Sequence, residues 1–134
     1  MDNVCGDIVE SILGRLARAW NAADGPAWGA EFTDDADFVN VFGAQMRGRG
    51  EIEQRHQYLF DALFKGSTVV DFPVADARLL APNVILAHST AVVRIPAGPM
   101  AGEHSSRQTV VLLQEESRTW RIAAVHNTSI TLQL

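Results

Sequence analysis

The sequence predicts an α+β domain: three N-terminal helices pack on a strongly curved antiparallel sheet of about six strands. Apolar residues recur at helical spacing in the first half of the chain, whereas residues after 66 form long runs rich in Val, Ile and Thr. Short turns join these runs, and consecutive strands joined by short turns pair antiparallel. Helices on one face of such a sheet make an α+β domain. We expect the sheet to curl around the third helix and leave a cone-shaped pocket that is open at one end.

Three segments of the first half carry helical signals. Over residues 7–23, apolar side chains recur every four positions and predict an amphipathic helix. Asp24 can cap a short second helix, in which Pro26 suits the first turn, and the spacing of Trp28 and Phe32 supports that helix. The third helix is expected over residues 51–64. Its apolar stripe includes a histidine and consists of Ile52, His56, Leu59, Phe60 and Leu63.

The remaining segments read as strands. Residues 36–43, ADFVNVFG, alternate in polarity, so Phe38, Asn40 and Phe42 would share one face of a strand. Residues 45–47 could form its short hairpin partner. The four long strands are expected at residues 68–80, 84–95, 104–115 and 120–131, with turns at the intervening Pro, Gly, Asn and Ser residues.

Composition narrows the class of protein. The chain of 134 residues is the size of one domain, 1–134, and its net charge is −5. That charge, with Lys65 as the single lysine, argues against nucleic acid and anionic membranes as partners. One cysteine, Cys5, cannot form an internal disulfide, and the sequence shows neither a secretory signal nor a membrane span. We therefore expect a soluble cytoplasmic protein.

Several stretches resemble a known superfamily. They are WNAAD (20–24), FTDDADFVNVFG (32–43), RGRGEIEQRHQYLFDALFKGS (47–67) and TWRIAAVHNTSI (119–130). With the four-strand tail they resemble the nuclear transport factor 2-like superfamily, a cystatin-like cone that includes ketosteroid isomerases and SnoaL-type polyketide cyclases. The resemblance is closest to the SgcJ/EcaC family, whose members recur in bacterial natural-product clusters, including enediyne pathways.

The resemblance bears directly on Asn40. In ketosteroid isomerases, the matching strand places a general-base aspartate at the position of Asn40, and the first helix places an oxyanion tyrosine at the position of Leu16. An amide cannot accept a proton at neutral pH, and leucine has no hydrogen to donate, so that reaction is disfavoured. Asn40 then either bonds a ligand oxygen or is a core asparagine that the protein itself satisfies.

Two histidines are further candidates. His56 lies on the inner stripe of the third helix, where it either lines the pocket or packs in the core. His126 shares a predicted strand face with Ile122 and Ala124, which makes it a pocket or interface candidate, and Asn127 is expected to point the other way. The candidate catalytic residues are His56, Asn40 and His126.

The aromatic residues predict the chemistry of the ligand. Many lie at helical spacing and are ordinarily core, but in a cone some must line the cavity, which favours a flat, apolar or aromatic ligand. We expect no metal, because the histidines are scattered, and no cofactor, because no dinucleotide fingerprint, flavin motif or cysteine pair is present. The predicted ligand-binding residues are Trp20, Trp28, Phe38, Asn40, Phe42, His56, Phe60 and His126.

Three functional hypotheses follow. The first is a pocket protein of polyketide or enediyne-type biosynthesis that binds, and in one version acts on, a hydrophobic polyene or aromatic intermediate. The second is a cyclase, isomerase or dehydratase that uses His56 as general acid or base. The third is a non-catalytic dimeric accessory module. Under each, the exposed outer face of the long strands predicts a homodimer.

Overall fold

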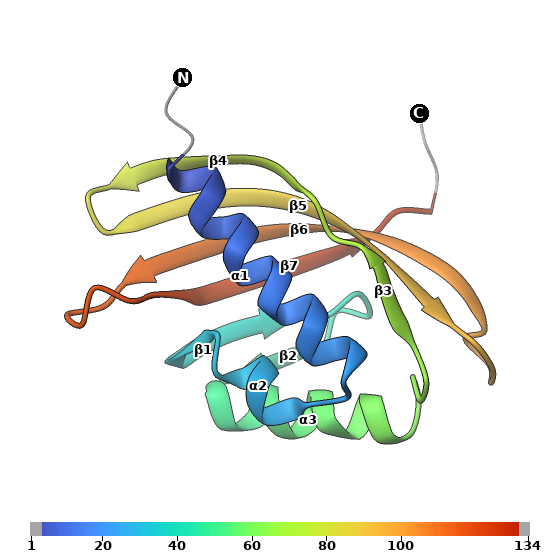
Figure 1. The fold of residues 1–134 in the computed structure, drawn as a ribbon. Coiled ribbons are helices and arrows are strands. Elements are labelled where there is room, and N and C mark those ends of the chain that lie inside the picture. The colour runs from blue at the N-terminus through green and yellow to red at the C-terminus, as the bar shows by residue number, and fades with distance from the viewer. Residues whose placement is uncertain (1–3, 132–134) are drawn as a thin grey trace.

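The computed structural model describes residues 4–131 and confirms the α+β class. Three helices pack on a sheet of seven strands (Figure 1). The helices are α1 (Val4–Asn21), α2 (Gly25–Gly29) and α3 (Arg49–Asp61). The strands are β1 (Phe32–Val39), β2 (Gln45–Arg47), β3 (Thr68–Asp71), β4 (Val74–Ala81), β5 (Val84–Ile95), β6 (Gly102–Gln114) and β7 (Trp120–Ser129).

The strand order is β2-β1-β7-β6-β5-β3, with β4 also paired to β5. Strands β5, β6 and β7 form the expected antiparallel meander, and β1 and β2 form the expected hairpin. Strand β1 joins the meander by pairing parallel to β7. The predicted strand at 68–80 is two strands, because Pro73 has no backbone N–H to donate to a ladder. Strands β3 and β4 therefore pair with different parts of β5.

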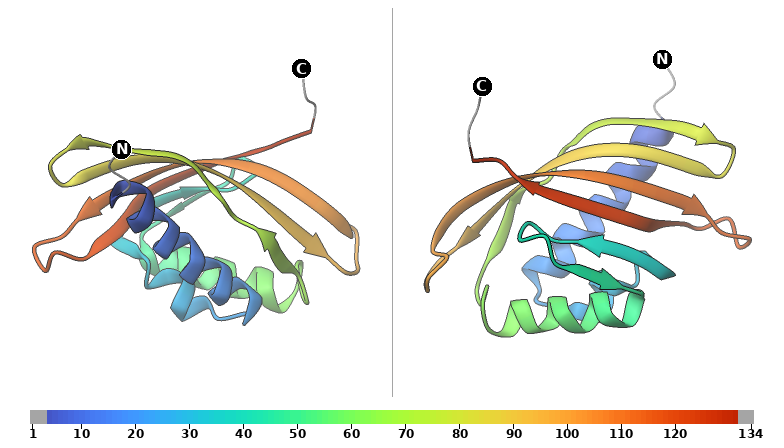
Figure 2. Two further views of the ribbon diagram at one scale, coloured as in Figure 1. Left: turned by 45° about the horizontal axis from the view of Figure 1, so that its top comes forward. Right: turned by 180° about the vertical axis from the view of Figure 1, so that it is seen from behind.

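All three helices lie on one face of the curved sheet, and the other face carries no helix (Figures 1 and 2). Helix α1 crosses this face, and α3 lies beneath the β1–β2 hairpin at the bottom of Figure 1. The buried stripe of α1 packs against the inner side of the sheet and consists of Val9, Ile12, Leu13, Leu16 and Ala19. This layer is the hydrophobic core, and it continues to the space between α3 and the sheet.

Helix α2 begins where the sequence predicted. The Asp24 side chain accepts a hydrogen bond from the Ala27 backbone N–H at 3.0 Å, and Pro26 lies in the first turn. The helix ends at Gly29, earlier than expected, and Phe32 is the first residue of β1 rather than part of a helix. A fully buried Phe32 side chain pairs in register with Ile122 of β7, so a sheet contact outweighs the local helical spacing here.

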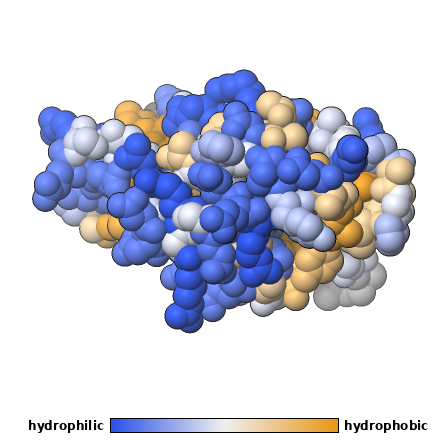
Figure 3. All heavy atoms as spheres, turned by 90° about the horizontal axis from the view of Figure 1, so that it is seen from below, coloured by the Kyte–Doolittle hydropathy of each residue, from blue (hydrophilic) through white to orange (hydrophobic). Residues whose placement is uncertain are grey.

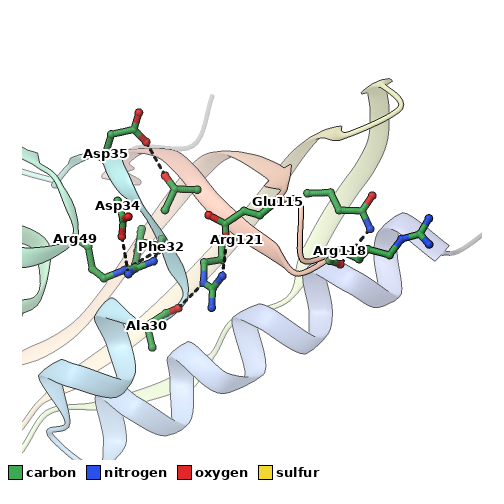
Figure 4. Close-up of polar contacts among 10 residues, drawn as sticks. Ala30, Phe32, Asp34, Asp35, Arg49, Glu115, Arg118 and Arg121 are labelled. Carbon is green, nitrogen blue, oxygen red and sulfur yellow. Dashed lines mark hydrogen bonds and ion pairs between the residues drawn. The ribbon is translucent and has the colours of Figure 1, made fainter.

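Arginine side chains connect α3 and β7 to the segment that contains β1 (Figure 4). Arg49, at the start of α3, donates from Nε and Nη2 to the Phe32 carbonyl at 2.9 and 2.5 Å and pairs with Asp34 at 2.7 Å. Arg121 of β7 donates to the Ala30 carbonyl at 3.2 Å and pairs with Glu115. The Arg49 bonds attach the start of α3 to β1, and the Arg121 bonds attach the segment before β1 to β7.

Candidate functional site

A cavity of about 150 Å³ lies between the helices and the inner face of the sheet. Its apolar lining comes from both layers and consists of Trp20, Trp28, Phe38, Val41, Phe42, Leu59, Phe64, Val69, Phe72, Ala91, Val93, Ile95 and Met100. Its polar lining consists of Asn40, His56, His104, Ser105, Ser106, Gln108, Asn127 and Ser129. Within the described part of the chain, no Asp, Glu, Lys or Arg lines this cavity. The site is therefore mostly apolar, with a few uncharged polar groups.

Phe42 marks the mouth of the cavity. It lines the cavity and yet is 59% exposed, because it lies in the turn between β1 and β2. Leu63, two residues after the end of α3, is also exposed. Seen from below, most of this face is hydrophilic, and hydrophobic residues gather at the end of the molecule that carries β3 and the β5–β6 turn (Figure 3).

Aromatic rings surround His56. The imidazole stacks on Trp28, with ring centroids 4.7 Å apart and an interplanar angle of 27°. Phe38 meets it edge-on at 4.7 Å and 86°, and Trp20 lies 6.4 Å away. These contacts hold the His56 ring in one orientation on the cavity wall.

His56 is buried as a neutral imidazole with one free nitrogen. The side chain is 2% exposed, and Nδ1 lies 2.7 Å from the Ile52 carbonyl one turn earlier in α3. Because a carbonyl only accepts, Nδ1 carries the hydrogen and Nε2 presents its lone pair. Burial is the main cause that lowers the pKa of His56 to about 4; the bond to Ile52 opposes it, and the nearby Arg55 charge adds to it. At neutral pH His56 is thus a hydrogen-bond acceptor at Nε2.

Trp28 carries an unsatisfied donor. Its indole Nε1 is the one buried side-chain nitrogen or oxygen in residues 4–131 that has no hydrogen-bond partner. Leaving such a donor unpaired costs roughly 1–3 kcal/mol. Native structures rarely leave a buried donor unpaired, and this donor belongs to the ring that stacks on His56.

Asn40 follows the last residue of β1 and lies in the β1–β2 turn, so the predicted strand at 36–43 ends earlier than expected. Its Oδ1 accepts hydrogen bonds from the backbone N–H groups of Phe42 and Ala44, both at 2.9 Å. This pattern is an asparagine turn that stabilises the hairpin. The Nδ2 group has no partner among the described residues, and Asn40 lines the cavity. The Oδ1 atom of the amide therefore stabilises the hairpin turn, and the Nδ2 group remains free to donate.

A hydrogen-bonded chain of polar side chains crosses the sheet beside the cavity. Ser89 donates to Gln108 Oε1 at 2.7 Å, and Gln108 Nε2 donates to Ser106 Oγ at 2.7 Å and to Asn127 Oδ1 at 3.1 Å. Asn127 Nδ2 then donates to the Val39 carbonyl at 2.8 Å. The chain links β5, β6, β7 and β1. The Gln108 amide uses its oxygen and both N–H groups, and the Asn127 amide uses its oxygen and one of its two N–H groups.

This hydrogen-bond chain was not among the features predicted from the sequence. A signal for it exists in the alternation of the strands: Gln108 shares its face with Val110 and Leu112, and Ser89 shares its face with Ala87 and Ala91. A polar residue in an otherwise apolar, inward period-two series marks a buried polar site.

His126 is exposed and does not line the cavity. The reason is a β-bulge in β7: Val111 pairs with Ala124 and Leu112 with Ile122, so Ala123 is an extra residue. The bulge reverses which face later residues take. His126 therefore faces outward beside Thr109, and the expectation that Asn127 points away from the pocket is wrong.

The other predicted ligand-binding residues divide into two groups. Trp20, Trp28, Phe38, Asn40, Phe42 and His56 come together on the cavity wall. Phe60 is buried behind them, with its ring 5.0 Å from Trp20, and does not line the cavity.

Solved structures show the same fold. A domain with a cystatin-like fold from Nostoc punctiforme is 23% identical over 98% of this chain and 81% of its own, with a TM-score of 0.86. A protein with a cystatin-like fold from Caulobacter vibrioides is 26% identical over 95% and 90%, with a TM-score of 0.80. A ketosteroid isomerase-like protein from Erwinia carotovora atroseptica is 16% identical over 98% and 100%, also at 0.80.

The chain therefore has the cystatin-like fold, which proteins described as nuclear transport factor 2-like share. No protein-family model and no curated protein matches the sequence. None of the helices in residues 4–131 is both long and apolar enough to cross a membrane. Over the same residues, no group of three or more His, Cys, Asp or Glu side chains is placed to hold a metal ion.

Proposed function

We propose that the protein binds a hydrophobic polyene or aromatic small molecule in this cavity, as a cytoplasmic pocket protein of polyketide or enediyne-type biosynthesis in bacteria. The observation that carries the proposal is a cavity with aromatic walls, an uncharged polar lining and an open, apolar mouth. Such a lining binds flat apolar molecules and orients them with a few hydrogen bonds. The pathway rests on the resemblance of the quoted stretches to the SgcJ/EcaC family.

The second candidate is an enzyme of the cyclase, isomerase or dehydratase type. It is favoured by the neutral His56, whose free Nε2 is the one proton acceptor with a shifted pKa on the cavity wall. With a pKa of about 4, this nitrogen has the base strength of an ordinary carboxylate. The solved ketosteroid isomerase-like structure shares the fold, which makes this chemistry worth testing but does not assign it.

Ligand binding can be tested with N-phenyl-1-naphthylamine, a neutral dye whose fluorescence rises in an apolar site. We expect the wild type to bind the dye and Ala91→Leu to bind it at least tenfold more weakly, because Ala91 lines the cavity and the larger side chain fills it. The matched control is Thr90→Leu, one residue away on the opposite face of β5, which should bind normally. Equal binding by both variants, or no binding by the wild type, would contradict the proposal.

The enzymatic candidate has a separate test. We expect an enzyme of this type to exchange the α-protons of 2-tetralone in D₂O faster than buffer does, as followed by mass spectrometry. His56→Phe should abolish the exchange while dye binding persists, because phenylalanine keeps the ring but has no lone pair. Exchange at the buffer rate by the wild type would argue against proton abstraction.

We further propose that the protein forms a homodimer through the outer face of β5, β6 and β7. Leu86, Val111 and Ala124 lie in one cross-strand row on this face, which no helix covers (Figure 2). An apolar row on an uncovered sheet face is typical of an interface between protein chains.

A further inference from the structure

The acceptor on His56 restricts what can bind beside it. The only hydrogen on the neutral ring is at Nδ1, where the Ile52 carbonyl accepts it at 2.7 Å. The other nitrogen, Nε2, has no partner among the described residues and offers only a lone pair. A ligand atom that meets Nε2 must therefore bring its own hydrogen. A ketone or ether oxygen, which only accepts, cannot form this bond.

The rest of the lining excludes charge. No Asp, Glu, Lys or Arg lines the cavity in residues 4–131, and the amides of Gln108 and Asn127 are held in place by hydrogen bonds within the protein. An ionised carboxylate or ammonium would lose its hydration without gaining a counter-charge, which is strongly unfavourable. Asn40 Nδ2 is a donor on the same wall with no partner among the described residues, and Asn40 lies two residues beyond Phe38, whose ring touches the His56 imidazole.

The size of the cavity limits the buried part of the ligand. A cavity of about 150 Å³ in an unrelated protein holds benzene. One six-membered ring with small substituents therefore fits here. Any further part of a larger molecule must leave through the mouth beside Phe42, which is apolar and exposed.

We propose that the site selects an uncharged hydroxyl group, a phenol or an enol on a single ring, which donates its hydrogen to His56 Nε2. This inference rests on the proposed function, because it names the ligand class of the same cavity. The hydroxyl oxygen keeps lone pairs that can accept from the Asn40 amide. Acceptor-only carbonyl compounds and carboxylates of the same shape bind less well, because they leave Nε2 unpaired or bring a buried charge.

Four small probes of matched shape test the selection: p-cresol, p-xylene, 4-methylacetophenone and p-toluate. Isothermal titration should show p-cresol binding roughly tenfold or more tightly than p-xylene and 4-methylacetophenone, with p-toluate weakest. In ¹⁵N-edited NMR, the Nε2 resonance of His56 should move on adding p-cresol and stay in place with p-xylene. Binding of the four probes to the wild type is enough to test the proposal, so the test does not depend on whether any variant folds.

A pair of histidine variants adds a control. His56→Phe should bind p-cresol and p-xylene equally, whereas His126→Phe should keep the preference, because His126 is exposed and does not line the cavity. If p-cresol and p-xylene bind the wild type equally, or p-toluate binds best, this inference is overturned and the proposed function survives. If none of the four probes nor the dye binds, the proposed function itself fails.

Discussion

Two cavity residues, His56 and Asn40, combine a structural bond with a free polar atom. His56 gives Nδ1–H to Ile52 and keeps Nε2, and Asn40 gives Oδ1 to two backbone N–H groups and keeps Nδ2. In each case the structural bond fixes the orientation of the free atom. This arrangement lets a small cavity hold its polar groups rigidly without charged residues.

The burial of His56 makes stability depend on pH. Its pKa is about 4 in the folded protein and 6.5 when exposed, so the unfolded chain binds the extra proton between these values. Stability is therefore complete above about pH 6.5, falls as pH drops toward about 4, and loses on the order of 3 kcal/mol from this group. Urea unfolding measured across this range should show a clearly shallower pH dependence for His56→Phe.

The control for that measurement is a variant that keeps His56. Tyr58→Phe, at an exposed position of α3, should leave the slope between pH 4 and 6.5 as steep as in the wild type, because the buried imidazole is unchanged. An equally steep slope in His56→Phe would mean that other groups cause the acid sensitivity.

Asn40 should contribute to the stability of the β1–β2 hairpin. We expect Asn40→Leu to lower the free energy of unfolding by about 1–2 kcal/mol, because two backbone N–H groups lose their acceptor. Asn40→Asp should retain most of the stability, since a carboxylate oxygen can accept the same two bonds. Chemical denaturation of both variants checks this, and equal losses would show that the acceptor does not matter.

At the scale of elements, the packing of α2 on α3 depends on the absence of a side chain at Gly25. A Cβ there would lie 2.5 Å from Gln57 Oε1, 2.9 Å from Gln57 Cβ and 3.1 Å from the Glu53 carbonyl oxygen. The Gly25 N–H also donates to Gln57 Oε1 at 2.6 Å. Because the Gln57 Cβ and the Glu53 backbone cannot both move aside, the two helices are held at their closest approach.

Alanine at two glycines should therefore have opposite effects. Gly25→Ala should destabilise the protein by about 1–3 kcal/mol through overpacking. Gly50→Ala, in the first turn of α3 with no atom within 4 Å of the new Cβ, should stabilise it by about 0.5–1 kcal/mol. Thermal unfolding gives both signs, and a neutral Gly25→Ala would show that α2 can shift on α3.

Local signals predicted the elements well where a single periodicity dominated. The stripe of α1, the cap at Asp24 and the bounds of β5 follow from side-chain spacing and turn residues alone. The errors occurred at Pro73, at the Ala123 bulge and at the end of β1, where one residue interrupts a regular pattern. An extra residue costs little locally but reverses which face of the sheet the later side chains take. Asn127 therefore lies on the cavity side and His126 on the outer side, the opposite of the prediction.

At the scale of the whole molecule, the uncovered sheet face supports the dimer. Size-exclusion chromatography with light scattering should give twice the chain mass of 14.6 kDa for the wild type. Val111→Lys should shift the protein to monomer, because it places a charge in the middle of the outer row. Gln54→Lys adds the same charge at an exposed position of α3 and should remain dimeric. A monomeric wild type at high concentration would rule out this interface.

The sequence by itself determined the α+β class, the helix order and four of the aromatic residues that line the cavity, because hydrophobic periodicity and turn chemistry are local properties of the chain; it missed Phe64 and Phe72, which also line it. The tertiary structure decided the site. The Ser89–Gln108–Asn127 hydrogen-bond chain joins residues from three strands, and the pKa of His56 depends on rings contributed by α1, α2 and β1. Register and burial are set by contacts between residues distant along the chain, and such contacts bring Asn40, Asn127 and His56 to one cavity.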